Sequence, residues 1–286
     1  GGDTIYLFDQ VEDKKSNCDV DMKVALEKAI NYAKVRGVKT NLTLNTLIKN
    51  NELADAINLA KKAYSLGVDA IIVQDLGLAR YLIKNFPGLE VHASTQMSVH
   101  NLNGVLKLQE LGFSRVVLSR ELSINEIDHI CKNSNTEIEV FTHGALCISY
   151  SGQCLFSSMI GGRSGNRGKC AGPCRLPYEL LQDDKKIDSG YLLSTRDLCG
   201  LEYIPSLIDA GVNCLKIEGR MKSPEYVATV TRIYRKYIDL ASSNNPYIID
   251  ENDKKELMQV FNRGMYCSGH FENTPNKNLV FKEKPN

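Results

Sequence analysis

The strongest indication of the fold is the segment Leu66-Gly67-Val68-Asp69-Ala70-Ile71-Ile72-Val73, in which a glycine ends a helical pattern and an apolar run follows at once. A glycine just past the last helical turn is the usual left-handed cap, and a short continuous apolar run is typical of a strand covered on both faces. The same join recurs at Gly37, Gly112 and Gly211. A helix that feeds a buried strand, repeated along the chain, predicts an α/β protein with a parallel sheet.

Seven strands are expected, and amphipathic helical segments separate them. The strands are expected at residues 4–8, 40–44, 70–73, 89–93, 116–119, 138–142 and 214–217. This alternation suits an open doubly wound sheet or a closed eight-stranded barrel. No Gly-x-Gly-x-x-Gly fingerprint follows the first strand, which favours a TIM-like (β/α)8 barrel that lacks its first strand and helix in this chain.

The barrel interpretation divides the chain into two parts. Residues 1–243 are expected to form the barrel, with a cysteine-rich insertion at 143–200 after the sixth strand, and 244–286 a helical or extended C-terminal segment. About 70 residues separate the sixth strand from the next clear one, and a small hairpin is expected at 178–181 and 191–193. Long loops in compact domains are usually functional, and barrel enzymes carry their chemistry in loops at the C-terminal ends of strands.

Composition excludes several classes of protein. The chain has 286 residues, of which 43% are hydrophobic and 24% charged, so neither a disordered chain nor a coiled coil fits. The net charge is only +1, so any affinity for RNA must come from a local patch. No apolar window of ~18 residues and no signal peptide is present, which predicts a cytoplasmic protein without a membrane segment. The chain starts without Met almost directly on a strand, which indicates that a longer protein has been cut.

Four of the nine cysteines lie within 28 residues of the insertion, at Cys147, Cys154, Cys170 and Cys174. Four thiolates that converge at a strand end can bind tetrahedral zinc or an iron-sulfur cluster. Their separations of seven, sixteen and four residues are wider than the gaps of a zinc ribbon, which favours iron and sulfur. Disulfides are disfavoured in the cytosol. The other five cysteines are expected to be ordinary thiols, with Cys199 as the first substitute ligand.

The insertion is also basic, since no acidic residue occurs between Glu139 and Glu179. Such a stretch could bind the phosphate oxygens of RNA, or it could be a solvated glycine-rich loop. Tyr150 and Phe156 could stack a base or pack around the cluster. The basic residues of the stretch are Arg163, Arg167, Lys169 and Arg175.

Lys216, Glu218 and Arg220 alternate along and just past the strand at 214–217, which puts their side chains on one face. If that face points into a barrel mouth, the two cations could bind a dicarboxylate, and Glu218 could act as a base or orient the substrate. A structural ladder of ion pairs is the alternative.

A second set of polar residues follows the strand at 89–93. His92 and Gln96 are candidate catalytic groups and Asn101 a candidate substrate-binding group, although each could instead orient or brace a loop. A peptidase would need a nucleophile or a metal-bound water, and the sequence has no His-Glu-x-x-His or Gly-x-Ser-x-Gly motif. His143, His92 and Glu139 could still form a two-histidine, one-carboxylate metal site.

The segment 139–157, which reads EVFTHGALCISYSGQCLFS, closely resembles the signature of the collagenase-like peptidase family U32. Members look like barrels that begin one strand and one helix earlier and often continue further. One departure is Arg196, where relatives usually have lysine, so that bidentate geometry becomes possible. Other motifs that agree with the family lie at 41–46, 92–101, 216–223 and 261–264.

The resemblance implies two kinds of activity. The family was named for peptidases, but members act in RNA hydroxylation, forming 5-hydroxyuridine in tRNA or hydroxycytidine in ribosomal RNA, or in ubiquinone synthesis. Several carry a 4Fe-4S cluster on four cysteines. The Cys-x3-Cys pattern of Cys170 and Cys174 is most similar to the RNA-hydroxylating branch, in which prephenate supports the reaction as co-substrate. RNA hydroxylation is therefore the first hypothesis, and a metallopeptidase and a non-catalytic RNA-binding module are the alternatives.

Overall fold

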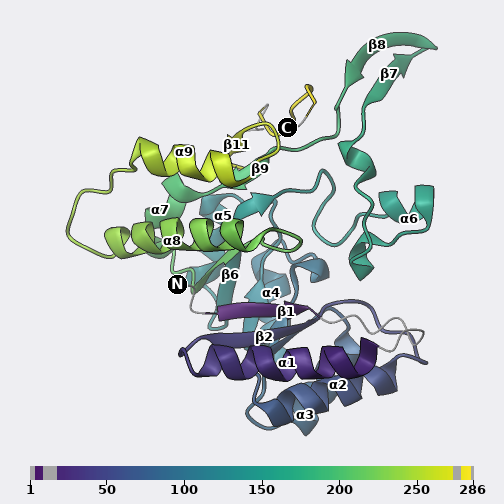
Figure 1. The fold of residues 1–286 in the computed structure, drawn as a ribbon, viewed down its shortest axis with the longest axis vertical. Coiled ribbons are helices and arrows are strands. Elements are labelled where there is room, and N and C mark those ends of the chain that lie inside the picture. Colours follow the sequence, from purple (N-terminus) through teal and green to yellow (C-terminus); the bar gives the residue numbers. More distant parts are fainter. Residues whose placement is uncertain (1–3, 9–17, 273–277, 285–286) are drawn as a thin grey trace.

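Strands and helices alternate along the chain in a computed structural model that describes residues 4–8, 18–272 and 278–284 (Figure 1). The strands of the main sheet are β1 (Thr4–Phe8), β2 (Lys39–Leu44), β3 (Ala70–Val73), β4 (Glu90–Ala93), β5 (Arg115–Val117), β6 (Glu137–Ala145), β9 (Asp197–Cys199), β10 (Cys214–Ile217) and β11 (Tyr266–Cys267). The helices are α1 (Cys18–Lys34), α2 (Leu53–Leu66), α3 (Leu76–Asn85), α4 (Leu102–Glu110), α5 (Ile124–Lys132), α6 (Phe156–Gly161), α7 (Ile204–Asp209), α8 (Pro224–Ala241) and α9 (Glu251–Val260). The predicted α/β class is confirmed.

The sheet is mostly parallel. Strands β1 to β6 pair in sequence order, each parallel to the next, and β10 pairs parallel with β6. From His143 to Ala145, β6 pairs antiparallel with β9, which in turn pairs parallel with β11. The sequence did not predict β9 or β11. Among the described strands, β1 pairs only with β2 and β10 only with β6, so their hydrogen bonds do not close a barrel.

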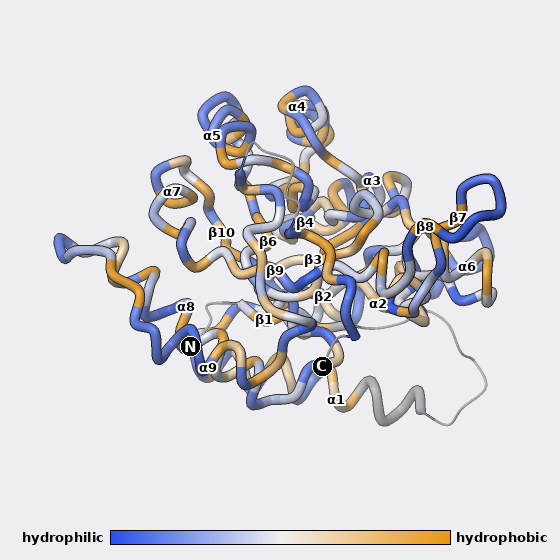
Figure 2. Tube along the Cα trace, turned by 90° about the horizontal axis from the view of Figure 1, so that it is seen from above, coloured by the Kyte–Doolittle hydropathy of each residue, from blue (hydrophilic) through white to orange (hydrophobic). Residues whose placement is uncertain are grey.

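The helix-to-strand joins form as the glycines predict. Gly67 has a φ of 75° and donates its N–H to the last carbonyls of α2, so a side chain there would be strained. The four residues of β3 that follow are all buried. Ile71 and Val73 belong to the main hydrophobic core, together with Ala60 of α2 and Leu82 of α3. The helices lie around the outside of the strands (Figure 2).

The sheet is rolled. Five strand spacings separate β1 from β6, which in a flat sheet would amount to about 24 Å. Yet the Tyr6 hydroxyl of β1 donates to Glu139 Oε1 of β6 at 3.0 Å and lies 3.9 Å from Cys214 Sγ of β10. Side chains on the inner face of β1 therefore reach those of β6 and β10.

The two faces of the strands differ in polarity because side chains alternate along a strand. In β6, Ile138 and Val140 pack in the main core with the helices, whereas Glu139 between them belongs to the inner face. In β4, His92 alternates in the same way with Val91 and Ala93. The rolled sheet thus has an apolar outside and a polar inside.

The insertion contains a hairpin that differs from the predicted one. Strand β7 (Tyr178–Gln182) pairs antiparallel with β8 (Lys185–Gly190), so the second strand does not lie at 191–193. The reason is the turn: Asp183 and Asp184 both have positive φ, which closes a two-residue hairpin directly after β7. The hairpin projects from the body of the molecule (Figure 1).

The C-terminal segment packs against the rest of the chain. Within it, α9 packs against α8 of the preceding part in a second core around Tyr226, Tyr234 and Tyr237, and β11 joins the main sheet through β9. Among the described helices, none is both long and apolar enough to cross a membrane.

Candidate functional site

Residues 146–177, here called the cysteine loop, lie over the C-terminal ends of the strands. A side chain at Gly152 would come within 2.4 Å of Gln96 O, which follows β4. The Arg220 guanidinium, which follows β10, donates to Gly168 O at 3.3 Å. Arg167 donates to Leu47 O at 3.0 Å and pairs with Glu52 at 2.6 Å. The loop therefore covers the end of the sheet at which parallel α/β enzymes carry their chemistry.

Gln96 is held at this end of the sheet by three loops. With its amide nitrogen turned toward them, it donates to Gln74 Oε1, Asn45 O and Asn166 O, each at 3.1 Å. Gln74 and Asn45 follow β3 and β2, and Asn166 belongs to the cysteine loop. The structure thus brings Gln96, a candidate catalytic residue, beside the cysteine loop, where its hydrogen bonds brace the surrounding loops.

The four cysteines of the loop converge. Burial raises the pKa of Cys174, the neighbouring Arg175 lowers it, and Cys147, Cys170 and Cys154 lie close enough to raise it further. None of the four forms a disulfide, and the Gly172 N–H donates to Cys170 Sγ at 3.3 Å.

The four thiols are a suitable donor set for an iron-sulfur cluster or zinc, because both require soft sulfur ligands close together. N–H to sulfur hydrogen bonds, such as that at Cys170, accompany iron-sulfur clusters and tune their potential. The four thiols are near one another but are not arranged as a formed metal site. Within the described part of the chain, no three His, Cys, Asp or Glu side chains form a group that could hold a metal ion. Cys199, the predicted substitute, is instead partly buried beside Tyr234, and desolvation raises its pKa.

Arg175 fastens the cysteine loop to the sheet. Its guanidinium donates to Leu146 O at 2.6 Å, to Thr195 Oγ1 at 2.9 Å and to Ser194 Oγ at 3.1 Å, and it also bonds to Thr195 O. All these acceptors lie at the ends of β6 and β9. Arg175, which the sequence suggested as a phosphate-binding residue, therefore holds the loop in place directly after Cys174.

Glu218 follows β10, at the end of the sheet that the cysteine loop covers. Its Oε1 accepts the Arg220 N–H at 2.9 Å, and its Oε2 lies 3.5 Å from Arg120 Nη2. Arg120 stacks 4.0 Å from the Phe141 ring centroid, and its Nε is buried without a hydrogen bond among the described residues. Gly144 has a φ of +106°, and a side chain there would overlap Glu218. Glu218 is thus held at the carboxyl end of β10, with one oxygen toward a desolvated arginine.

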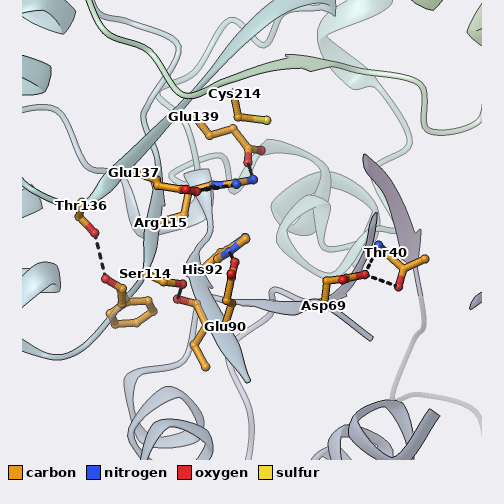
Figure 3. A network of polar contacts seen from close by, with 12 residues as sticks. Thr40, Asp69, Glu90, His92, Ser114, Arg115, Thr136, Glu137, Glu139 and Cys214 are labelled. Carbon is orange, nitrogen blue, oxygen red and sulfur yellow. Dashed lines mark hydrogen bonds and ion pairs between the residues drawn. The ribbon is translucent and has the colours of Figure 1, made fainter. Parts of the chain in front are cut away.

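Lys216 and His92 lie elsewhere, in the polar interior of the rolled sheet. Figure 3 shows His92 there with Arg115 and Glu139. Lys216 Nζ pairs with Glu139 Oε1 at 2.8 Å, and Arg115 Nη1 lies 3.3 Å from Glu139 Oε2. Burial alone would raise the pKa of Glu139, but Lys216, Arg115 and His92 together lower it. His92 Nε2 contacts Glu90 at 3.1 Å. We call Lys216, Glu139, Arg115, His92, Glu90 and Tyr6 the interior network. For Lys216, this geometry supports the structural ladder of ion pairs and not the anion site.

The predicted two-histidine, one-carboxylate metal site is not formed. His92 and Glu139 are in the interior network, whereas His143 contacts the Tyr234 hydroxyl at 3.2 Å and packs among the rings of Tyr226 and Tyr266. No metal-binding group involving them occurs in the described residues.

The remaining predicted binding residues have local partners. Asn101 caps α4, because its side chain accepts the Gly104 N–H at 2.9 Å, and it lines an outer cavity of about 870 Å³. Arg163 donates to Lys169 O at 2.9 Å within the cysteine loop. Arg167, as described, joins the loop to the segment after β2. The basic stretch is thus partly structural.

A family model described as peptidase family U32 matches residues 13–280. The chain belongs to this family. It is 40% identical to the 23S rRNA 5-hydroxycytidine C2501 synthase of Escherichia coli, over 84% of this chain and 36% of that protein. It is 36% identical to tRNA hydroxylation protein P1 of Bacillus subtilis, over 96% of this chain and 67% of that protein. It is also 36% identical to a collagenase of Porphyromonas gingivalis, over 84% of this chain and 61% of that protein. The chain therefore spans about one third to two thirds of the length of these relatives.

Sequence reasoning missed three residues of this U32 chain that lie beside the cysteine loop. Asp197, Lys222 and Arg263 influence one another's ionisation: Arg263 lies 3.8 Å from Asp197, and both shift the pKa of Lys222. The family motifs at 216–223 and 261–264 contain two of them. Because those motifs are far apart in the sequence, only the fold shows that they meet.

Proposed function

We propose that this protein is an RNA hydroxylation enzyme that forms 5-hydroxyuridine in tRNA or hydroxycytidine in ribosomal RNA, acting in the cytoplasm. The observation that carries the proposal is the convergence of four free cysteines over the C-terminal ends of the strands. The names of relatives from Escherichia coli and Bacillus subtilis, a 23S rRNA synthase and a tRNA hydroxylation protein, support the substrate class.

We propose that Cys147, Cys154, Cys170 and Cys174 bind a 4Fe-4S cluster, with zinc as the alternative, and that prephenate is the co-substrate. A cluster of this kind would supply one-electron chemistry at the cysteine loop. The chain's own groups have other tasks: Arg175 fixes the loop, Gln96 braces the loops below it, and Glu218 is available to orient a polar group. Hydroxyl ligands do not replace thiolates, so serine at any of the four positions should release the metal.

Contacts to RNA phosphates would come from the outer side of the cysteine loop. Arg163 and Lys169 are the candidates there, while Arg167 also holds the loop in place. Phosphate contacts are independent of base sequence and sensitive to salt, so the Arg163→Ala and Lys169→Ala changes should weaken binding equally for all RNAs.

Peptidase activity is the second candidate, and its support is the collagenase name of relatives from Porphyromonas gingivalis and the protease name of one from Methanocaldococcus jannaschii. The geometry favours it less, because the only predicted peptidase metal site is split between the interior network and the His143 rings. The third candidate function is that of a non-catalytic RNA-binding module.

The experiment that tests the proposal is nucleoside mass spectrometry of RNA from a bacterial strain that lacks its own hydroxylation proteins and expresses this protein. We expect hydroxylated uridine or cytidine with the wild type and none with the Cys174→Ser variant. The Cys131→Ser variant, in α5 away from the loop motif, is the matched control and should keep activity. Bound RNA without any hydroxylated nucleoside would favour the module, and cleavage of gelatin without RNA modification would favour the peptidase.

A further inference from the structure

A second buried polar cluster lies at the end of the sheet that carries the cysteine loop, and the proposed function leaves it unexplained. We call it the His143 cluster; it consists of His143, Asp197, Lys222 and Arg263. His143 lies near the end of β6, Asp197 opens β9, Lys222 follows β10 and Arg263 precedes β11. His143 and Asp197 are 1% and 2% exposed, which is unusual for ionisable side chains that are not fully paired.

The hydrogen bonds of Tyr234 determine which nitrogen of His143 carries the proton. The Tyr234 hydroxyl has one proton and donates it to Thr142 O at 2.8 Å. Its contact with His143 Nδ1 at 3.2 Å therefore requires the imidazole to donate. Burial and the nearby Lys222 lower the pKa of His143 to about 3, so the ring is neutral at pH 7. His143 Nε2 is then a bare acceptor, and it is buried without a partner among the described residues.

A second acceptor in the cluster is also unsatisfied. Asp197 Oδ1 is buried and accepts no hydrogen bond from the described residues, because Arg263 Nη1 is 3.8 Å away and too distant to donate one. An unpaired buried polar atom costs about 1–3 kcal/mol, so two of them in one cluster indicate that a donor from outside the chain is expected there.

Two cations accompany these acceptors. Lys222 Nζ lies 2.9 Å from the centroid of the Phe261 ring, and among the described residues no carboxylate is within ion-pair distance of it. Arg263 is only 30% exposed and has the distant Asp197 as its partner. Arg175 and Glu218 also act on Lys222, so three cations face two carboxylates and the cluster keeps an excess of positive charge.

Aromatic rings enclose the cluster. His143 lies 6.0 Å from the Tyr226 ring and 5.1 Å from the Tyr266 ring, and Tyr226 packs 6.3 Å from Phe261, measured between ring centroids. Such walls suit an apolar or ring-shaped body and strengthen charge interactions by excluding water.

We infer that the His143 cluster binds a small hydroxycarboxylate, its carboxylate against Lys222 and Arg263 and its hydroxyl donating to His143 Nε2. The inference rests on the proposed function, because it gives the co-substrate of that function a place in the fold. It also replaces the predicted anion site: Lys216 is neutralised by Glu139, and Arg220 donates to the cysteine loop.

Three small probes separate the parts of the inference: mandelate has ring, hydroxyl and carboxylate, phenylacetate lacks the hydroxyl, and 1-phenylethane-1,2-diol lacks the carboxylate. Ligand-detected NMR titration of the purified protein should show mandelate binding about tenfold more tightly than phenylacetate, which corresponds to one hydrogen bond, and no binding of the diol. Prephenate should displace mandelate.

Two variants test the residues. Lys222→Met should weaken mandelate at least tenfold, whereas Lys185→Met, on the exposed hairpin, should not change it. In His143→Phe, mandelate and phenylacetate should bind equally, because the hydroxyl acceptor is gone. Equal binding of mandelate and the diol, no binding of any probe, or full affinity in Lys222→Met would overturn the inference. A protein that hydroxylates RNA but binds no probe disproves this inference alone, and one that binds mandelate without hydroxylating RNA disproves the proposed function alone.

Discussion

The interior network and the His143 cluster are both buried and charged, but they differ in how completely their carboxylates are paired. Glu139, at the centre of the interior network, has Lys216, Arg115 and Tyr6 as partners. In the His143 cluster, Asp197 Oδ1 has none among the described residues; a histidine nitrogen without a partner occurs in both groups, His143 Nε2 here and His92 Nδ1 in the interior network. A buried charge alone is therefore no sign of a site, since only an unsatisfied one leaves chemistry for a ligand.

The largest expected effect comes from breaking the paired carboxylate of Glu139. Glu139→Gln would leave Lys216 without its counter-ion and Arg115 with Glu137 as its remaining partner, so we expect the free energy of unfolding to fall by about 3–5 kcal/mol. Urea denaturation measures it. Glu110→Gln is the matched control, because Glu110 is 68% exposed in its pair with Lys107 and should change stability by less than about 1 kcal/mol. A loss below 1 kcal/mol for Glu139→Gln would mean that the network contributes little to the fold.

The second effect is a dependence of stability on pH. Burial lowers the pKa of His143 to about 3, so below pH about 6.5 the unfolded chain binds a proton that the folded chain does not. Stability should therefore fall as the pH is lowered from 6.5 toward 3, with His143 contributing about 1.4 kcal/mol per pH unit. His143→Gln should remove that contribution, while the lowered pKa of buried His92 leaves a remainder. His129→Gln, on the exposed surface of α5, should keep the whole slope; an unchanged slope in His143→Gln would show that His143 is not held neutral.

The third effect concerns the cysteine loop above the two clusters. Gly152 and Gly162 both have positive φ, but an added methyl at Gly152 would overlap the Gln96 backbone, whereas nothing lies within 4 Å at Gly162. Gly152→Ala should cost about 1–3 kcal/mol more than Gly162→Ala and speed cleavage of the loop by limited proteolysis. Equal behaviour of the two variants would mean that the loop is not seated on the strand ends.

The smallest effect on stability is expected at Asp197. Burial raises its pKa, against the opposing influence of Arg263 and Lys222, so its ionisation destabilises the folded chain as the pH rises above the usual value of 3.8. Asp197→Asn removes this cost, and at pH 7 the variant should be within about 1 kcal/mol of the wild type or slightly more stable. If urea denaturation showed that the variant loses more than about 2 kcal/mol of unfolding free energy, the Asp197 carboxylate would be as fully paired as the Glu139 carboxylate.

Local sequence patterns predicted the strands well, because a glycine cap such as Gly67 followed by an apolar run is compatible with few structures other than a helix end and a buried strand. The turn at Asp183 was misplaced, since two aspartates rarely signal a hairpin. The sequence also grouped the four cysteines, which are neighbours along the chain. It could not place Lys216 against Glu139 or Arg263 beside Asp197, because those contacts depend on how far the sheet rolls.

Iron and acid-labile sulfide analysis of anaerobically purified protein, combined with the absorbance near 400 nm, tests the central claim that the cysteine loop binds an iron-sulfur cluster. We predict four iron and four sulfide per chain, as a 4Fe-4S cluster requires. Both should be lost in Cys174→Ser and retained in Cys131→Ser. A colourless protein with one zinc per chain and no sulfide, or a full cluster in Cys174→Ser, would contradict the account.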